Sequence, residues 1–396
     1  MAPVTRAGAA QPLPPPPTLT EQGLERYETT FRQHYQEWAV ILQRNAERLA
    51  RGQYSLHWLD TDKANWGRRA KPSSRGLTYT DINNVKPYGD MPVEADWRNF
   101  TARGSVREPY RHEMPTIEEY TVLDRGEVWA DNVITLYEEA KARQWNATRD
   151  IPWHELEPLP EDLEKATCQL CTFLTEVEFV AGDFPAKWMY RIPQDFLEVK
   201  SFLATQIMDE ARHQEVFRKR AIAGGGLMHA APGFEWALQA ILQAPTHTMG
   251  TFLLNLLGEG LVLSIFRSGE MIAKTHVDKE IFRRCLQDEA RHVSYGVMQF
   301  KYYLDTHANR EQALEEMHRF ADVGEQVILS AFTEPALVES VAVLLGGGLE
   351  HIDNGMEGMI KLWSMLIDEY LQRCERAGFP RRGRCTIPQQ MPWRAA

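Results

Sequence analysis

The chain has few cysteines, an excess of negative over positive charge and no long uncharged apolar segment. Its 396 residues include five cysteines, and the formal net charge is −11. An acidic chain lacks the basic surface that binds nucleic acid or anionic membranes, so we expect neither as a partner. Because so few cysteines, odd in number, do not make a disulfide framework, we expect a reducing compartment, the cytoplasm.

We expect neither a membrane-spanning helix nor a leader. The longest apolar run, residues 251–266, is short for a membrane-spanning helix and carries Glu259 in its middle. We interpret it as a buried helix of a soluble protein. Residues 1–20 are rich in proline and contain no apolar core of a signal peptide, so a disordered tail is expected there.

Two cofactor motifs are also absent from the sequence. It has no GxGxxG nucleotide fingerprint and no cysteine set for an iron–sulfur cluster. Cys168 and Cys171 form a lone C-x-x-C pair inside a helical pattern, for which we favour core packing over a redox or metal role. A zinc site would need a second pair or suitably spaced histidines.

Apolar residues recur at helical spacing along most of the chain. Glycine triplets at 224–226 and 346–348 interrupt this pattern, as expected at helix ends. No alternating strand pattern of useful length appears, so the predicted fold is all-α. The predicted helices cover residues 20–50, 131–144, 160–182, 194–222, 233–243, 248–272, 277–305, 310–332, 334–345 and 354–377.

Residues 53–130 differ from the rest, with scattered glycine, proline and tryptophan and no sustained period. We expect an irregular arm that packs through its aromatic side chains. The predicted organisation has four segments. They are a disordered proline-rich tail (1–20), an N-terminal helix with the irregular arm (21–130), a helical domain (131–380) and a C-terminal tail (381–396).

The pentapeptide Asp-Glu-Ala-Arg-His occurs twice, at residues 209–213 and 288–292. Within each copy Glu and His are three residues apart, which places them on one face of a helix. That face is otherwise apolar in both copies. A buried carboxylate is costly unless it is compensated, so two helices with the same exception need a shared reason. The residues concerned are Glu210, His213, Glu289 and His292.

A lone glutamate precedes each copy in the apolar stripe of an upstream helix. Glu259 lies 30 residues before Glu289, and Glu178 lies 32 residues before Glu210. These spacings suit two antiparallel helices and a turn, present twice. Glu176 is the alternative to Glu178, although it falls near the edge of its stripe. Four carboxylates and two imidazoles predict a pair of divalent ions inside a helix bundle.

Each pentapeptide also begins with an aspartate and contains an arginine. We expect Asp209 and Asp288 each to accept the outer N–H of the ligand histidine on the other helix, which would fix its tautomer. Arg212 and Arg291 are expected to pair with these aspartates. Because the arrangement is duplicated, we favour this role over surface ion pairs.

The same Glu-x-x-His spacing occurs a third time, at Glu315 and His318. There the apolar stripe runs through Met317 and Ala321. Glu315, His318, Asp322 and Glu325 are therefore expected on a solvated face, with no ligand role.

The duplicated motif resembles the ferritin-like di-iron carboxylate superfamily. The nearest likeness is to the catalytic subunits of bacterial multicomponent monooxygenases and to the ribonucleotide reductase small subunit, which carry an Asp-Glu-x-x-His form. The segment Glu178-Phe179-x-Ala181 is similar to a Glu-Tyr-x-Ala segment of the monooxygenases. The resemblance covers residues 160–300 and implies a ferritin-like four-helix bundle core with additional helices.

The resemblance also implies two iron ions (Fe2+/Fe3+), with manganese or a mixed Mn/Fe pair left open. It implies O2 and a small-molecule substrate bound in an apolar pocket, with electrons from a ferredoxin or flavin reductase. A homodimer is expected. The leading function is a di-iron monooxygenase. The alternatives are a di-iron oxidase or peroxidase, a ferroxidase-type iron-handling protein, and a non-catalytic bundle with a degenerate site.

Three positions depart from individual subfamilies. Phe217 stands where radical-forming reductase subunits have tyrosine, and Leu263 where the monooxygenases have threonine. Cys285 stands where arylamine N-oxygenases have a seventh, histidine ligand. The substrate therefore does not transfer from any one subfamily. Tyr295, one turn past His292, either borders the site or is a packed helix tyrosine.

Overall fold

The computed structural model describes residues 21–56, 59, 69–85, 123–231, 234–328 and 334–388. The chain divides into two compact units, residues 1–67 and 68–396. The described part of the first unit contains the helix α1 (Glu21–Ala50). The second unit contains all the other described helices. The tail at 1–20 and most of the arm lie outside the described residues, and the domain limits expected from the sequence stay predictions.

The all-α prediction is confirmed, since the described residues contain no β-strand beyond one isolated bridge. A π-helix, Phe252–Gly258, joins α8 to α9 and was not predicted. The helices of the second unit are α2 (Tyr79–Asn83), α3 (Arg125–Val128), α4 (Val133–Ala142), α5 (Glu161–Met189), α6 (Leu197–Gly224), α7 (Glu235–Leu242), α8 (His247–Thr251), α9 (Glu259–Ile272), α10 (His276–Thr306), α11 (Arg310–Ile328), α12 (Pro335–Gly346) and α13 (Ile352–Ala377).

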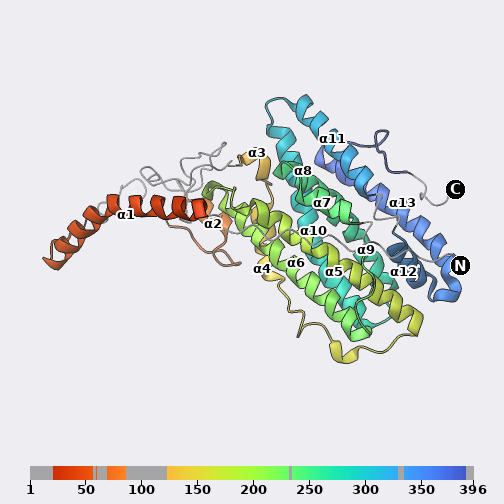
Figure 1. Cartoon of the computed structure of the whole chain (residues 1–396). Helices are drawn as coiled ribbons and strands as arrows, with labels where there is room; N and C mark the ends of the chain where they lie inside the picture. Colours follow the sequence, from red (N-terminus) through yellow and green to blue (C-terminus); the bar gives the residue numbers. More distant parts are fainter. Residues whose placement is uncertain are drawn as a thin grey trace. The chain divides into compact units, whose positions relative to one another are not determined.

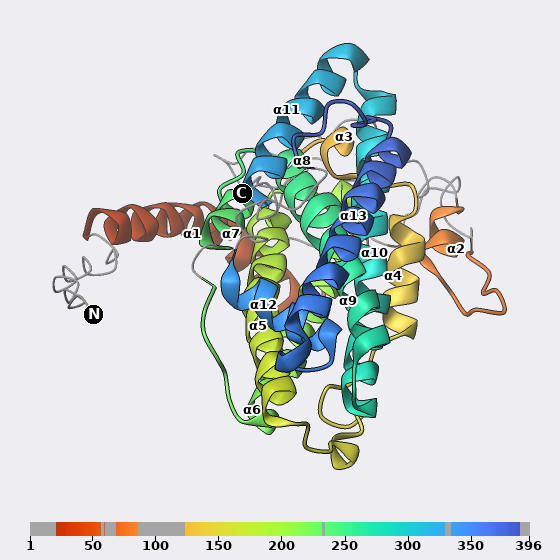
Figure 2. The same ribbon diagram turned by 90° about the vertical axis from the view of Figure 1, so that its right-hand side faces the viewer.

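Four long helices, α5, α6, α9 and α10, form the central bundle (Figure 1). They make two helix pairs, α5 with α6 and α9 with α10, and α10 also packs on α6. The C-terminal helices cover this bundle (Figure 2): α12 packs on α5, and α13 packs on both α9 and α10. The two pentapeptides therefore face each other from α6 and α10.

Helix ends follow local chemistry. Thr275 caps α10, where its hydroxyl oxygen accepts from the backbone N–H of Asp278 at 3.0 Å. The two glycine triplets end α6 and α12 as predicted, with φ of 144° at Gly225 and 84° at Gly347, values that favour glycine. By contrast, α5 continues through Pro185 to Met189, past residue 182 where the sequence predicted its end.

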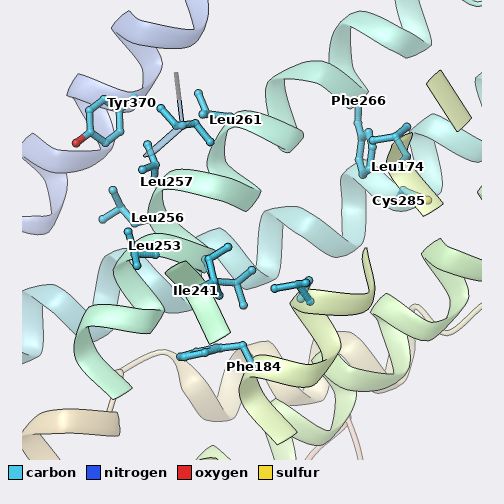
Figure 3. Packing of buried hydrophobic residues seen from close by; sticks show 14 of the residues in the cluster. Leu174, Phe184, Ile241, Leu253, Leu256, Leu257, Leu261, Phe266, Cys285 and Tyr370 are labelled. Atoms are coloured by element: carbon cyan, nitrogen blue, oxygen red, sulfur yellow. The ribbon is translucent and has the colours of Figure 1, made fainter. Parts of the chain in front are cut away.

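The interior of the second unit is rich in aromatic and aliphatic side chains (Figure 3). Phe266 lies 5.4 Å from Phe217 and 6.0 Å from Phe282, measured between ring centroids. Cys168 and Cys171 are buried free thiols in this interior, and burial raises the pKa of both. Neither thiol is therefore prepared to ionise.

The longest apolar run lies in the π-helix and α9. In the described residues, the stretch His247–Ile272 is long and apolar enough to cross a membrane by length and composition, and 72% of its most apolar window is buried inside the protein. The bent pair of α12 and residues 349–377 passes the same test as one broken span.

The expectation of a solvated face on α11 is wrong for two of its four residues. Glu325 and His318 are buried, because Arg381 from the segment after α13 covers them. Arg381 donates to both carboxylate oxygens of Glu325 at 3.0 Å, and the hydroxyl of Tyr370 donates to the same carboxylate at 2.7 Å. Glu315 is exposed, and the half-exposed Asp322 accepts from Arg381 at 2.6 Å. This paired, hydrogen-bonded cluster fixes the C-terminal segment on α11.

His247 at the start of α8 makes stability depend on pH. Its Nδ1 lies 2.9 Å from the carbonyl oxygen of Glu127, and its Nε2 has no partner among the residues that the structure describes. Burial lowers the pKa of His247 to about 4. As the pH falls, the unfolded chain therefore binds a proton at this histidine near pH 6.5, whereas the folded chain binds it only near pH 4. This histidine's contribution to the free energy of unfolding is complete above pH 6.5 and lost as the pH falls to 4, about 3 kcal/mol in all.

Replacing His247 with glutamine should reduce this pH dependence of the free energy of unfolding, measured by denaturant titrations, by the same amount. The same change at the exposed His351 is the matched control, and the loss of stability that His247 causes between pH 6.5 and pH 4 should remain.

Candidate metal centre

Side chains from all four bundle helices converge at one buried point. None of the six expected ligands is more than 3% exposed. Their ligand atoms form two groups, within each of which the atoms lie within 4.8 Å of one another. Glu210 and Glu289 belong to both groups and would lie between two ions. The first group adds Glu178 and His213 to this shared pair, and the second adds Glu259 and His292.

Each shared carboxylate turns one oxygen toward each imidazole. Glu289 has Oε1 3.3 Å from Nδ1 of His213 and Oε2 3.5 Å from Nδ1 of His292. Glu210 does the same, with Oε2 3.4 Å from Nδ1 of His213 and Oε1 2.9 Å from Nδ1 of His292. The arrangement therefore has two positions with two carboxylates in common.

Within the described residues, most of these inward atoms have no hydrogen-bond partner. They are both oxygens of Glu210 and of Glu289, Oε1 of Glu178, and Nδ1 of both histidines. Buried polar atoms left without partners cost free energy, so such a cluster calls for a ligand. Carboxylates and imidazoles together suit iron and manganese. The residues present therefore fit a pair of divalent ions of this kind.

The choice that the sequence left between two glutamates has a geometric answer. Glu178 faces the cluster, with its Oε2 3.8 Å from Nδ1 of His213. Glu176 is half-buried and accepts a hydrogen bond from the backbone of Ala231 at 3.3 Å. The geometry favours Glu178 as the ligand.

The aspartates of the two pentapeptides hold the histidines across the bundle. Nε2 of His213 lies 3.2 Å from Asp288, and Nε2 of His292 lies 3.3 Å from Asp209. Each histidine thus contacts the aspartate of the other helix. When Nε2–H donates to the carboxylate, Nδ1 presents its lone pair to the cluster.

The arginines complete this outer layer. Arg291 donates to Asp209 at 2.8 Å and to Asp288 at 2.5 Å. Arg212 donates to Asp288 at 3.1 Å and also to Asp209. All four side chains are buried, so the two positive charges offset the two negative ones in a region of low polarity.

Two residues of the loop after α4 belong to this layer and were missed by sequence reasoning. Trp145 donates from Nε1 to Asp288 at 2.7 Å, and its ring centroid lies 5.0 Å from the guanidinium carbon of Arg212. The side-chain oxygen of Gln144 accepts from Arg212 at 2.5 Å. Nothing in the local sequence pattern places this loop against α6 and α10.

Two amides hold Glu259 and were also missed. Gln206 donates to Oε1 at 2.9 Å and Asn255 donates to Oε2 at 2.8 Å. Each amide stands one turn before a candidate ligand, Glu210 or Glu259, in an apolar stripe, and that spacing was a readable signal. Gly296 lets α10 approach here, since a Cβ on it would lie 2.7 Å from Cβ of Asn255.

Phe217, Leu263 and Cys285, which depart from known subfamilies, belong to neither ligand group. Tyr295, one turn past His292, does not belong to either group. The hydroxyl of Tyr295 donates to the carbonyl of Val128 at 2.7 Å, so it is a packed helix tyrosine. Phe217 packs on Phe266 in the core. Burial raises the pKa of the Cys285 thiol to about 11.

Electrostatics divides the six residues. Burial raises the pKa of Glu178 and of Glu259 well above the usual value. Burial also opposes ionisation of Glu210, but contacts with both histidines hold its pKa below the usual value. For His213 and His292, burial disfavours the imidazolium, but their neighbours outweigh it and raise the pKa of both. In the metal-free cluster these surroundings therefore favour the protonated forms of Glu178, Glu259 and both imidazoles.

An apolar cavity of about 70 Å³ adjoins the cluster. Its polar lining residues are the carboxylates Glu178, Glu259 and Glu289, and all the others are apolar or glycine. Several wall residues come from the π-helix, α7 and α9 (Figure 3), among them Ile241, Leu253, Leu257 and Leu261. This volume accommodates about five water-sized groups, comparable to one small ring.

Comparisons with known proteins support the fold. No family model matches the chain, and no curated protein matches its sequence. A solved mutant of an R2-like ligand-binding oxidase with an Fe/Fe cofactor has a TM-score of 0.50 and 20% identity, covering 63% of this chain and 94% of that one. Another mutant, with a Mn/Fe cofactor, has a TM-score of 0.49 and 18% identity, covering 66% and 95%. The likeness to the Fe/Fe mutant, at a TM-score of 0.50, shows a ferritin-like helical fold.

Proposed function

We propose that this protein is a non-haem di-iron oxygenase that inserts oxygen from O2 into a small apolar substrate. The observation that carries the proposal is a set of six buried candidate ligands opening onto an apolar cavity. Iron or a Mn/Fe pair suits this ligand set, and the solved neighbours carry Fe/Fe and Mn/Fe cofactors. When bound and reduced, such a pair supplies electrons to O2. The proposed ligands are Glu178, Glu210, His213, Glu259, Glu289 and His292.

In this proposal, the protein's own side chains orient the imidazole rings, bind the substrate and exclude water. Asp209 and Asp288 hold the imidazole rings with Nδ1 inward. The apolar walls bind the substrate and keep water away from the carboxylates. The balanced reaction takes one O2, two electrons and two protons, and returns one oxygen atom in the product and the other in water. Since the chain has no nucleotide fingerprint, a ferredoxin or flavin reductase is the proposed electron donor.

A second candidate function is an oxidase that reduces O2 without inserting oxygen. The solved neighbours are named ligand-binding oxidases, which favours this alternative. In both cases we propose a cytoplasmic homodimer, and light scattering of the full chain measures its mass.

Isotope labelling separates the two functions. The iron-loaded protein is reduced by dithionite, mixed with ¹⁸O2 and incubated with small cyclic hydrocarbons and a cell extract. An oxygenase places one labelled atom in an organic product, whereas an oxidase leaves all the label in hydrogen peroxide (two electrons per O2) or in water (four electrons per O2). Absence of O2 consumption by the reduced, iron-loaded protein contradicts both.

Filling the cavity should stop product formation without removing the metal. Val262 lines the cavity, so Val262→Phe removes space for substrate. We expect turnover to fall at least about tenfold, the usual scale for a changed methylene or more in an apolar pocket. Iron content by mass spectrometry should be unchanged. Val323→Phe is the matched control, because Val323 is 43% exposed and lies outside the cavity. Equal turnover by the two variants would place the substrate elsewhere.

A further inference from the structure

A second pocket, of about 550 Å³, lies between α9, α10 and α13 and shares no lining residue with the apolar cavity. Its α10 wall is largely apolar, with Val293, Val297 and Met298. The opposite side carries three arginines in a chain of net charge −11, Arg267, Arg373 and Arg376. One pocket thus combines an apolar wall with concentrated positive charge.

Arg373 is the unusual member, because it is only 6% exposed and has no carboxylate partner among the described residues. Its Nε donates to the carbonyl oxygen of Leu256 in the π-helix at 3.2 Å. One terminal nitrogen, Nη2, has no hydrogen-bond partner in the part of the chain that the structure describes. The guanidinium lies against Gly260, where a Cβ would come within 2.5 Å of Nε. A buried guanidinium with an unpartnered nitrogen calls for an anion, and burial lowers its pKa to about 10.

The one acidic residue of the pocket does not supply that anion. Glu369 accepts from Arg267 at 2.6 Å through Oε1 and from Ser264 through Oε2. Its charge is therefore offset by Arg267. Arg373 and Arg376 remain, and in the described part of the chain Arg376 has no ion pair. Ser294 on α10 accepts from Asn132 at 2.9 Å, which leaves its hydroxyl hydrogen for a ligand.

We propose that this pocket binds a small organic carboxylate, with the carboxylate group between Arg373 and Arg376 and the apolar body against Val293 and Val297. Guanidinium groups bind carboxylates through paired hydrogen bonds, and the aliphatic wall selects a ligand with an apolar portion over an inorganic anion. The site depends on the fold and not on the metal centre. Because Arg373 also donates to the carbonyl oxygen of Leu256, this arginine would link the ligand to the π-helix that precedes Glu259.

Calorimetric titration of the metal-loaded full chain with benzoate tests the proposal. Benzoate should bind saturably, with a Kd on the order of 1 mM or tighter. Benzyl alcohol, which has the same ring without the charge, and inorganic phosphate should each bind at least about tenfold more weakly. Arg376→Gln changes an exposed residue and should weaken benzoate binding about tenfold, and Arg373→Met should abolish it. Arg218→Gln, an exposed arginine on α6, is the matched control and should bind as the parent does.

Each outcome decides the matter. Benzoate binding that is about tenfold weaker in Arg376→Gln supports the site even when Arg373→Met fails to fold. Benzoate binding that survives both substitutions places the ligand elsewhere, the metal centre included, and overturns the proposal. Preference for phosphate over benzoate overturns the assigned ligand class, and no saturable binding overturns the site.

Discussion

Replacing Glu289 with alanine is expected to leave the chain without a stably bound metal pair, whereas Glu178→Ala should lose one ion of the two. The reason is that the two glutamates occupy different positions in the cluster. Glu289 has one oxygen near each imidazole, so both ions depend on it, while Glu178 belongs to one group. Metal analysis after anaerobic loading and desalting should give two ions for the parent, about one for Glu178→Ala and close to none for Glu289→Ala.

Glu176→Ala is the matched control for this experiment. Glu176 stands on the same helix, two residues from Glu178, and contacts the backbone of Ala231 rather than the cluster. It should retain both ions. If Glu176→Ala loses metal while Glu178→Ala keeps it, the wrong glutamate has been assigned. If Glu289→Ala keeps both ions, the assignment of Glu289 as a ligand shared by both ions is wrong.

The helices and the six candidate ligands were predictable because their signals are local. An ionisable residue in an apolar stripe is visible within one helix, and the repetition of the exception indicates a common cause. Even Gln206 and Asn255 carried the same signal, one turn before a ligand. The prediction failed at α11, where Glu325 and His318 were expected on a solvated face. Arg381, which buries both side chains, comes from the segment after α13, and the apolar periodicity within α11 contains no information about that segment.

Features made by contacts between distant segments were not predictable. Trp145 reaches Asp288 from the loop after α4, and Arg373 reaches Leu256 from α13. Neither pair has a characteristic spacing, because the packing of whole helices brings it together. The π-helix was missed for a related reason. Its apolar sequence suits an ordinary α-helix equally well, and it was predicted as one.

Removing the metal should destabilise the protein, and the loss should grow as the pH rises. In the metal-free chain, burial raises the pKa of Glu178 and Glu259, and their surroundings raise the pKa of His213 and His292. Near neutral pH the folded metal-free chain thus binds more protons than the unfolded chain, and its free energy of unfolding falls as the pH rises through these raised values. Bound metal requires these groups to be deprotonated, so metal affinity changes in the opposite sense.

Melting temperatures of metal-free and Mn2+-loaded protein at pH 6.5 and pH 8 test this, since Mn2+ avoids oxidation in air. At free metal about 1,000 times Kd, each site adds about 4 kcal/mol, which corresponds to a difference on the order of 10 °C for two sites. We expect the difference between the two forms to be larger at pH 8. In the metal-free double variant Glu178→Gln with Glu259→Gln, the neutral amides replace the buried acids, so melting should depend less on pH than in the metal-free parent. A difference that narrows as the pH rises would mean that these carboxylates ionise without metal, and that the protons are not what the metal displaces.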